Sequence, residues 1–271
     1  MDHPQHLRLT VADHAAHGLH LGGAPEVGLP ILLVHGLACS SQVWAPLLAH
    51  MAERTFRREA IALDMPGYGR TPGPHHALDI DELAAWNLAA LAARGHARVH
   101  VVGHSMGCQV AFAMARADPA RVASVTLVGP TTGAEGQRLG RYALGLCADA
   151  LFESWAYNRT LLRMTRQMGL RRYIHTVPAM LRDRPISQAD QVRCPVLIVR
   201  GTRDAIVPAR VARRLANALP RGRCRQVPQV AHAVQFDRPA AFLHELLPFL
   251  AEVEATTLRD DARPQAAPRD A

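Results

Sequence analysis

One serine stands in a setting that suits nucleophilic chemistry. Ser105 lies at the centre of Gly103-His-Ser-Met-Gly107, directly after the apolar, β-branched run 99–102. Gly-x-Ser-x-Gly between a strand and a helix is typical of a sharp turn that projects the serine hydroxyl out of a sheet. Side chains two positions before and after the serine would collide with neighbouring backbone, which explains the glycines Gly103 and Gly107. A serine hydroxyl attacks a carbonyl only when a base takes its proton, so the chemistry requires a partner elsewhere in the chain.

The elements that must hold this turn alternate between strands and helices. Short apolar runs predict strands at residues 31–34, 60–63, 99–102, 122–128 and 195–199. Helical spacing of apolar residues separates them at 44–54, 80–93, 106–117, 209–218 and 239–253. Strands that are apolar on both faces belong in a parallel sheet covered by helices on each side. The sequence therefore predicts an α/β fold with right-handed crossovers.

Two segments depart from this alternation. Residues 7–12 alternate at period two and can pair with 17–21 through a turn at 13–16, which predicts an antiparallel hairpin at a sheet edge. Residues 133–191 contain no strand-like run, but apolar residues there recur three or four positions apart. These are Leu139, Tyr142, Leu146 and Ala150, and then Ile174, Val177 and Leu181. We expect this segment to form a helical lid above the sheet.

The domain prediction follows from these patterns. Residues 1–132 and 192–255 form two parts of one core, 133–191 form the lid, and the polar residues 256–271 form a disordered tail.

Composition excludes several classes of protein. The chain has 271 residues, of which 49% are hydrophobic and 20% charged, as expected for a globular protein. No run approaches the roughly 18 apolar residues of a membrane span, and the first residues lack the pattern of a secretory signal. Five cysteines without a Cys-x-x-Cys pair favour a reducing compartment, so we expect a cytoplasmic protein, monomeric or homodimeric.

The net charge of +8 invites a nucleic-acid interpretation, which the distribution of charge argues against. All 31 basic residues are arginines, scattered singly or in pairs without a nucleic-acid-binding motif. We therefore expect no specific nucleic-acid partner. The fifteen histidines lack the spacing of metal ligands, and we expect neither a metal nor a cofactor.

With its elbow motif, the chain resembles the α/β-hydrolase superfamily over residues 7–253. His35-Gly36, after the first predicted parallel strand, matches the family's oxyanion loop. Residues 64–71 match its Asp-x-Pro-Gly-x-Gly-x-Ser turn, with Thr71 in the place of the serine. The resemblance implies an α/β-hydrolase fold with an inserted helical lid, and catalytic residues in the chain order serine, acid, histidine.

Two residues fit that order. Asp204 closes the turn after the predicted strand 195–199, while the rival acid position of the family, residues 129–132, holds no carboxylate. His232 is the only histidine between the Asp204 turn and the last predicted helix. The resemblance makes His232 the base that takes the proton of Ser105 and later protonates the leaving group. Asp204 would fix the imidazole tautomer and stabilise the imidazolium.

The resemblance also implies an oxyanion hole. The backbone N–H groups of Leu37, which follows Gly36, and of Met106, which follows Ser105, are the expected donors. Losing one such donor typically costs about 3–4 kcal/mol of transition-state stabilisation. Cys108 is expected to be a small packing residue.

The sequence favours a hydrolase of carboxylic esters, lactones or thioesters. Ser105 at the elbow argues against dehalogenases and epoxide hydrolases of this fold, which use aspartate there. The alternative is a carbon–carbon bond hydrolase of the meta-cleavage-product type, although Ala231-His232-Ala233 departs from the Gly-His-Trp usual there. A second alternative is a homologue that binds small molecules without turnover.

The predicted lid is rich in arginine. The residues are Arg138, Arg141, Arg159, Arg163, Arg166, Arg171, Arg172, Arg182 and Arg184. Most would be solvated, and one or two could clamp a substrate carboxylate as a bidentate pair.

Overall fold

The structure, a computed structural model, describes residues 3–54, 57–136 and 139–261. Within these residues the centre is an eight-stranded sheet in the order β1-β2-β4-β3-β5-β6-β7-β8. The strands are β1 (Gln5–Val11), β2 (His14–Leu21), β3 (Ile31–Val34), β4 (Ala60–Leu63), β5 (Val99–His104), β6 (Val122–Val128), β7 (Val196–Gly201) and β8 (Gly222–Val227). β2 runs antiparallel to β1 and β4, and every other pair is parallel. The predicted α/β fold is confirmed.

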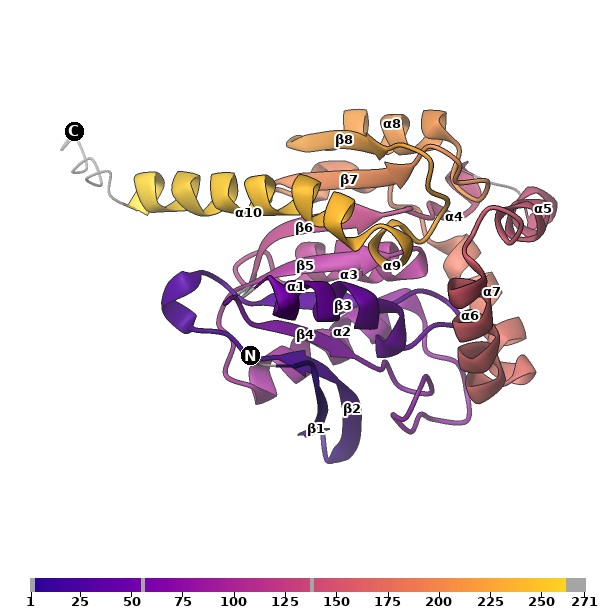
Figure 1. Ribbon diagram of the computed structural model, residues 1–271, viewed down its shortest axis with the longest axis horizontal. Helices are drawn as coiled ribbons and strands as arrows, with labels where there is room; N and C mark the ends of the chain where they lie inside the picture. The colour runs from indigo at the N-terminus through magenta and orange to yellow at the C-terminus, as the bar shows by residue number, and fades with distance from the viewer. Residues whose placement is uncertain (1–2, 55–56, 137–138, 262–271) are drawn as a thin grey trace, which may run out of the picture.

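Helices cover both faces of the sheet (Figure 1). They are α1 (Ala45–Glu53), α2 (Ile80–Ala93), α3 (Met106–Ala117), α4 (Gly133–Gly136), α5 (Leu139–Asp149), α6 (Trp155–Met168), α7 (Leu170–Arg182), α8 (Ala209–Ala218), α9 (Val234–Asp237) and α10 (Pro239–Asp261). α2, α3 and α8 bury their apolar residues against one face, and α1, α9 and α10 against the other. This three-layer arrangement is the expected way to bury strands that are apolar on both sides.

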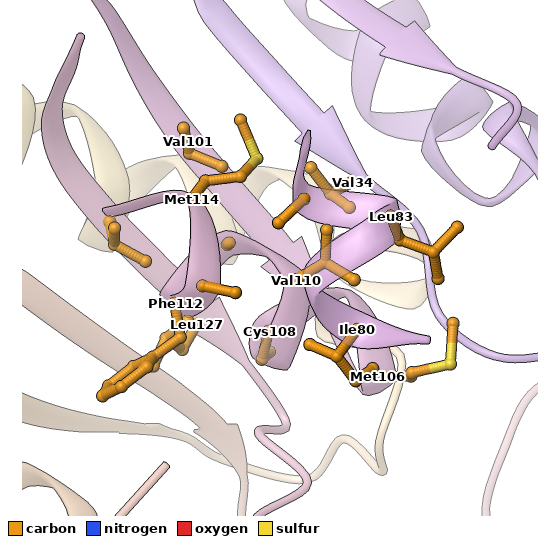
Figure 2. Packing of buried hydrophobic residues seen from close by; sticks show 14 of the residues in the cluster. Val34, Ile80, Leu83, Val101, Met106, Cys108, Val110, Phe112, Met114 and Leu127 are labelled. Carbon is orange, nitrogen blue, oxygen red and sulfur yellow. The ribbon is translucent and has the colours of Figure 1, made fainter. Parts of the chain in front are cut away.

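Helix α3, which starts immediately after Ser105, lies deep in the core. Met106 and Val110 are fully buried, and Figure 2 shows them close to Ile80 of α2. Burying a side chain of this size contributes about 1.5–3 kcal/mol. The helix that follows the serine is therefore held in a fixed position, and so is the turn that carries the serine.

Helices α4 to α7 lie between β6 and β7 in the chain and gather at the carboxyl ends of the parallel strands (Figure 1). The apolar face predicted for α7 is only partly right, since Ile174 is 57% exposed. The helix instead buries Thr176, Ala179 and Met180. No helix within the described ranges is long and apolar enough to cross a membrane.

Two segments differ from the prediction by more than two residues. The hairpin turn is tighter, because Val11 pairs with His14 and only Ala12 and Asp13 remain between the strands, both with positive φ (46° and 64°). Such paired positive φ values match the twist of a two-residue hairpin. Residues 256–261 belong to helix α10, so the expected tail begins too early. Residues 262–271 lie outside the described ranges.

Candidate active site

Ser105 forms a strained turn between β5 and α3. Its backbone has φ 56° and ψ −120°, a conformation that costs a residue other than glycine about 1–3 kcal/mol. The N–H of Ser105 donates to the carbonyl of Val128 on β6 (2.9 Å), and its carbonyl accepts from Cys108 (3.0 Å). These two bonds hold the strained residue at the carboxyl end of the sheet.

The two elbow glycines allow the turn by leaving room for backbone. A Cβ on Gly103 would lie 2.3 Å from the carbonyl oxygen of Gly107. A Cβ on Gly107 would lie 2.3 Å from the carbonyl oxygen of Val34. Both distances are far inside van der Waals contact, so the steric reason for glycine at these positions is confirmed. Cys108 also packs tightly here, because its thiol donates to the Gly103 carbonyl (3.2 Å), and burial raises the pKa of that thiol.

Asp204 lies in the turn after β7, where its carboxylate has three partners. Oδ1 accepts from the N–H groups of Ile206 (2.9 Å) and Val207 (2.7 Å). Oδ2 lies 3.0 Å from Nδ1 of His232. Buried Arg200 braces the same turn by donating to the carbonyls of Asp204 (2.8 Å) and Val207 (2.6 Å). The carboxylate is therefore fixed in orientation, with one oxygen reserved for the imidazole.

His232 is buried beside that carboxylate, and its second nitrogen is unused. Nε2 has no hydrogen-bond partner among the residues that the structure describes. Burial lowers the pKa of His232, but the charge and hydrogen bond of Asp204 outweigh burial and leave the pKa above its ordinary value. A neutral ring that donates from Nδ1 to Asp204 presents Nε2 as a free acceptor. This is the protonation state required of a base that takes a proton from serine.

The loop after β3 lies against the serine. A Cβ on Gly36 would lie 2.9 Å from the Cβ of Ser105, so only glycine allows this approach. His35 ties the loop down, since its Nε2 accepts from the N–H of Met65 (3.0 Å) and its Nδ1 donates to the Gly36 carbonyl (2.9 Å). The N–H of Leu37 has no backbone acceptor among the described residues. The loop position is compatible with the predicted oxyanion role, which stays a prediction for Leu37 and Met106.

These groups share one cavity of about 300 Å³. Ser105, His232 and Leu37 line it, together with three tyrosines and two acids. Those five residues are Tyr142, Tyr157, Tyr173, Asp149 and Glu153. The structure thus places Ser105 and His232 on one cavity, with Asp204 beside His232, and the catalytic roles of the three residues stay a prediction. The described residues hold no cluster of three or more His, Cys, Asp or Glu suited to a metal ion.

The cavity does not contain the arginine that the predicted carboxylate clamp requires. None of the lining residues within the described ranges is an arginine. Arg172 instead donates to the carbonyls of Pro74 and His76 (2.6 and 3.2 Å), and Arg159 lies over the ring of Trp155. Arg138 lies outside the described residues.

Sequence reasoning did not find Asp149 and Glu153. Both are almost fully buried, with exposed fractions of 3% and 8%. Burial raises the pKa of Glu153 to about 10 and also raises that of Asp149. The available signal is two carboxylates four positions apart at the end of a predicted helix, a spacing that surface helices also show.

The comparisons with known proteins agree with this fold. A family model described as "alpha/beta hydrolase fold" matches residues 30–150. The matched segment contains the loop at His35–Leu37 and the turn at Ser105. The chain belongs to the α/β-hydrolase superfamily.

Individual relatives point to several reactions. One is the dihydrolipoyllysine-residue acetyltransferase component of an acetoin cleaving system from Pseudomonas putida, 32% identical over 85% of this chain. The chain spans 65% of that relative's length. A protein named "Putative carbamate hydrolase RutD" from Variovorax paradoxus is 29% identical over 85% of this chain and 95% of its own. A pimeloyl-[acyl-carrier protein] methyl ester esterase from Methylococcus capsulatus is 28% identical over 83% and 96%.

Among solved structures, an esterase named RhEst1 from Rhodococcus sp. ECU1013 superimposes with a TM-score of 0.70. The match covers 92% of this chain and 99% of that one at 21% sequence identity. Similarity at this level of identity supports the fold alone.

Proposed function

We propose that this protein is a serine hydrolase that cleaves carboxylic esters of small molecules, with lactones and thioesters as chemical variants. The observation that supports the proposal most directly is that His232 lines the same cavity as the strained Ser105, while its Nδ1 lies 3.0 Å from Oδ2 of Asp204. Nε2 of His232 has no partner among the described residues, Ser105 included, so it is free to accept the hydroxyl proton when the two side chains meet. The methyl ester esterase and the carbamate hydrolase among the relatives act, by their names, at carbonyl groups of this kind.

In the proposed first step, Oγ of Ser105 attacks the ester carbonyl carbon while Nε2 of His232 takes the hydroxyl proton. The carbonyl π electrons move to oxygen, and the N–H groups of Leu37 and Met106 are proposed to hold that oxyanion. The oxyanion then collapses, the bond to the alcohol breaks, and His232 returns its proton to the leaving alcohol. An acyl group remains on Ser105.

In the proposed second step, water takes the place of the serine. His232 removes a proton from water, hydroxide attacks the acyl carbon, and Ser105 leaves with the proton from His232. Asp204 keeps Nδ1 protonated throughout and stabilises the transient imidazolium. We propose that helices α4 to α7 act as a lid, which would exclude bulk water from the first step.

The test is covalent labelling combined with turnover. A fluorophosphonate should add one adduct to the wild type, located on Ser105 by peptide mass mapping. The Ser105→Ala variant should fold normally, take up no label and lose nearly all hydrolysis of p-nitrophenyl acetate. Ser187→Ala, which removes an exposed serine of the insertion, is the control and should label like the wild type.

Two results would overturn the proposal. One is an adduct on another residue, and the other is a Ser105→Ala variant that still turns over esters. A wild type that folds, binds esters and hydrolyses none would indicate the non-catalytic alternative. Cleavage of a meta-cleavage product with no ester hydrolysis would indicate the carbon–carbon bond alternative.

A further inference from the structure

Two buried carboxyl groups at the substrate cavity are held in place by backbone. Asp149 ends α5, and its Oδ1 accepts from the N–H of Ala205 (3.1 Å). Glu153 lies four residues further on, and its Oε1 accepts from the N–H of Ala233 (2.6 Å). Each side chain is thus anchored through one oxygen, and the carboxyl of Glu153 faces those of Asp149 and Asp237, which both add to the effect of burial in raising its pKa.

No arginine balances these acids within the described residues, and the ionisable base that acts on Asp149 is His232. Neither Asp149 nor Glu153 forms an ion pair there, and the cavity lining includes no arginine. Oε2 of Glu153 has no hydrogen-bond partner in the described part of the chain, although Glu153 is only 8% exposed. Buried polar oxygens without partners are costly, so they usually have a role.

The rest of the cavity wall suits a positive charge. Tyr142, Tyr157 and Tyr173 line the same space, and the first two are almost fully buried. The face of a tyrosine ring carries partial negative charge and attracts cations, most strongly where water is excluded. Aromatic walls and carboxylates together are the usual surroundings of a bound ammonium group.

A purely structural role does not require acids here. An amide oxygen of asparagine or glutamine could accept from Ala205 and Ala233 equally well, without the cost of burying ionisable groups. The acids therefore provide something that the two backbone bonds do not use, namely negative charge, which from Asp149 helps to raise the pKa of His232 and is also available to a ligand.

Resting on the proposed function, we propose that the substrate carries an ammonium group. That group lies against the carboxyl groups of Asp149 and Glu153, between the tyrosine rings, while the ester carbonyl lies at Ser105. The proposed site would favour cationic substrates over carboxylate-bearing ones. This preference is the opposite of the one expected from the arginine clamp in the sequence analysis.

Binding of such a group also explains how the free enzyme tolerates the two acids. Burial and the neighbouring acids Asp149 and Asp237 raise the pKa of Glu153 to about 10, so Glu153 is protonated when the cavity holds no cation. A bound ammonium group would favour the charged form of Glu153, so binding should release a proton and should strengthen as pH rises.

The test compares esters that differ only in charge. Acetylcholine and 3,3-dimethylbutyl acetate place the charge on the alcohol. The p-nitrophenyl esters of 4-(trimethylammonio)butanoate and 5,5-dimethylhexanoate place it on the acyl chain. Each kcat/KM is divided by the rate constant of the same ester with hydroxide, which removes intrinsic reactivity. We expect the wild type to favour the charged member of at least one pair by about tenfold.

The variants Asp149→Asn and Glu153→Gln keep the acceptors for the backbone N–H groups and remove the charge. Each should reduce the preference for the charged ester by about fivefold or more, seen mainly in KM. Asp183→Asn, which changes a half-buried acid of α7's C-terminal cap outside this cavity, is the matched control and should keep the wild-type preference.

A measurement on the wild type alone protects the test against variants that fail to fold. Choline should inhibit hydrolysis of p-nitrophenyl acetate more strongly than its neutral analogue 3,3-dimethylbutan-1-ol. The proposal is overturned if the wild type prefers the charged member of neither pair, or if the variants lose both esters equally. Labelling of Ser105 with hydrolysis of neutral esters alone would leave the proposed function intact and reject only the ammonium site.

Discussion

Replacing Asp204 with asparagine tests the proposed triad because the structure fixes how the new amide must lie. Oδ1 of Asp204 accepts from two backbone N–H groups, those of Ile206 and Val207. In Asp204→Asn the amide oxygen must keep this position, because the flipped amide would face both N–H groups with its own NH₂. Leaving a buried donor without an acceptor costs about 1–3 kcal/mol, hence about 2–6 kcal/mol for the two.

The favoured orientation directs the amide NH₂ at His232. It donates to Nδ1, which lies 3.0 Å from the present Oδ2, and the ring proton moves to Nε2. Nε2 can then no longer accept the proton of Ser105. Even the lower limit of 2 kcal/mol keeps the flipped form below roughly 5% of the population. We expect kcat to fall by about 10⁴-fold, the size of loss that a wrong histidine tautomer causes in a serine protease.

The assay is steady-state hydrolysis of p-nitrophenyl acetate together with thermal unfolding. Asp204→Asn should unfold within about 1 kcal/mol of the wild type, because both backbone bonds survive. Asp204→Ala is the companion variant and should lose about 2–6 kcal/mol, because both N–H groups lose their acceptor. A folded Asp204→Asn protein whose kcat lies within tenfold of the wild type would refute the reasoning and move the acid role to another carboxylate.

Two further predictions concern protonation. The kcat/KM for a neutral ester should fall on the acid side with an apparent pKa above 6.5, because Asp204 raises the pKa of His232 and only neutral His232 accepts a proton; an acid limb centred below 6.5 would contradict this. Glu254 accepts from both Nη atoms of Arg58 (2.6 and 2.9 Å), and although burial alone would raise the pKa of Glu254, His100 and Arg58 lower it overall. The ion pair of Glu254 therefore stabilises the fold at pH values above the ordinary pKa of a glutamate, and this stabilisation is lost as pH falls below that value. Glu254→Gln should lower the free energy of unfolding by about 1–3 kcal/mol at pH 7 and by less at pH 3, measured by denaturant unfolding. An equal loss at both pH values would argue against the ion pair.

Local sequence signals located the core of this fold because each was physically strong. The central strands β3, β4 and β6 have the predicted bounds, since apolar runs with two buried faces have few other conformations open to them. The elbow was equally clear, because Gly103 and Gly107 are required by contacts with backbone that no side chain could satisfy.

The sequence patterns did not predict a strand at the edge of the sheet or the polar end of the last helix. Strand β8 reads Gly-Arg-Cys-Arg-Gln-Val and lies at the sheet edge, so it lacks the apolar run that identified the other parallel strands. The end of α10 is polar, yet Thr256 and Thr257 donate to the carbonyls of Glu252 and Val253 and continue the helix. Asp149 and Glu153 could not be predicted from the sequence, because what distinguishes them is their burial beside the cavity and not their spacing.

Gly129 has a consequence for how this enzyme could evolve. It follows β6 with φ 56°, and a Cβ there would lie 2.6 Å from Nδ1 of His232 and 3.3 Å from Oδ2 of Asp204. An ancestor or descendant that moved its acid to this position could not pass through a form carrying both acids, because the new side chain would displace the imidazole. The usual neutral route, in which a duplicate is gained before the original is lost, is therefore closed at position 129.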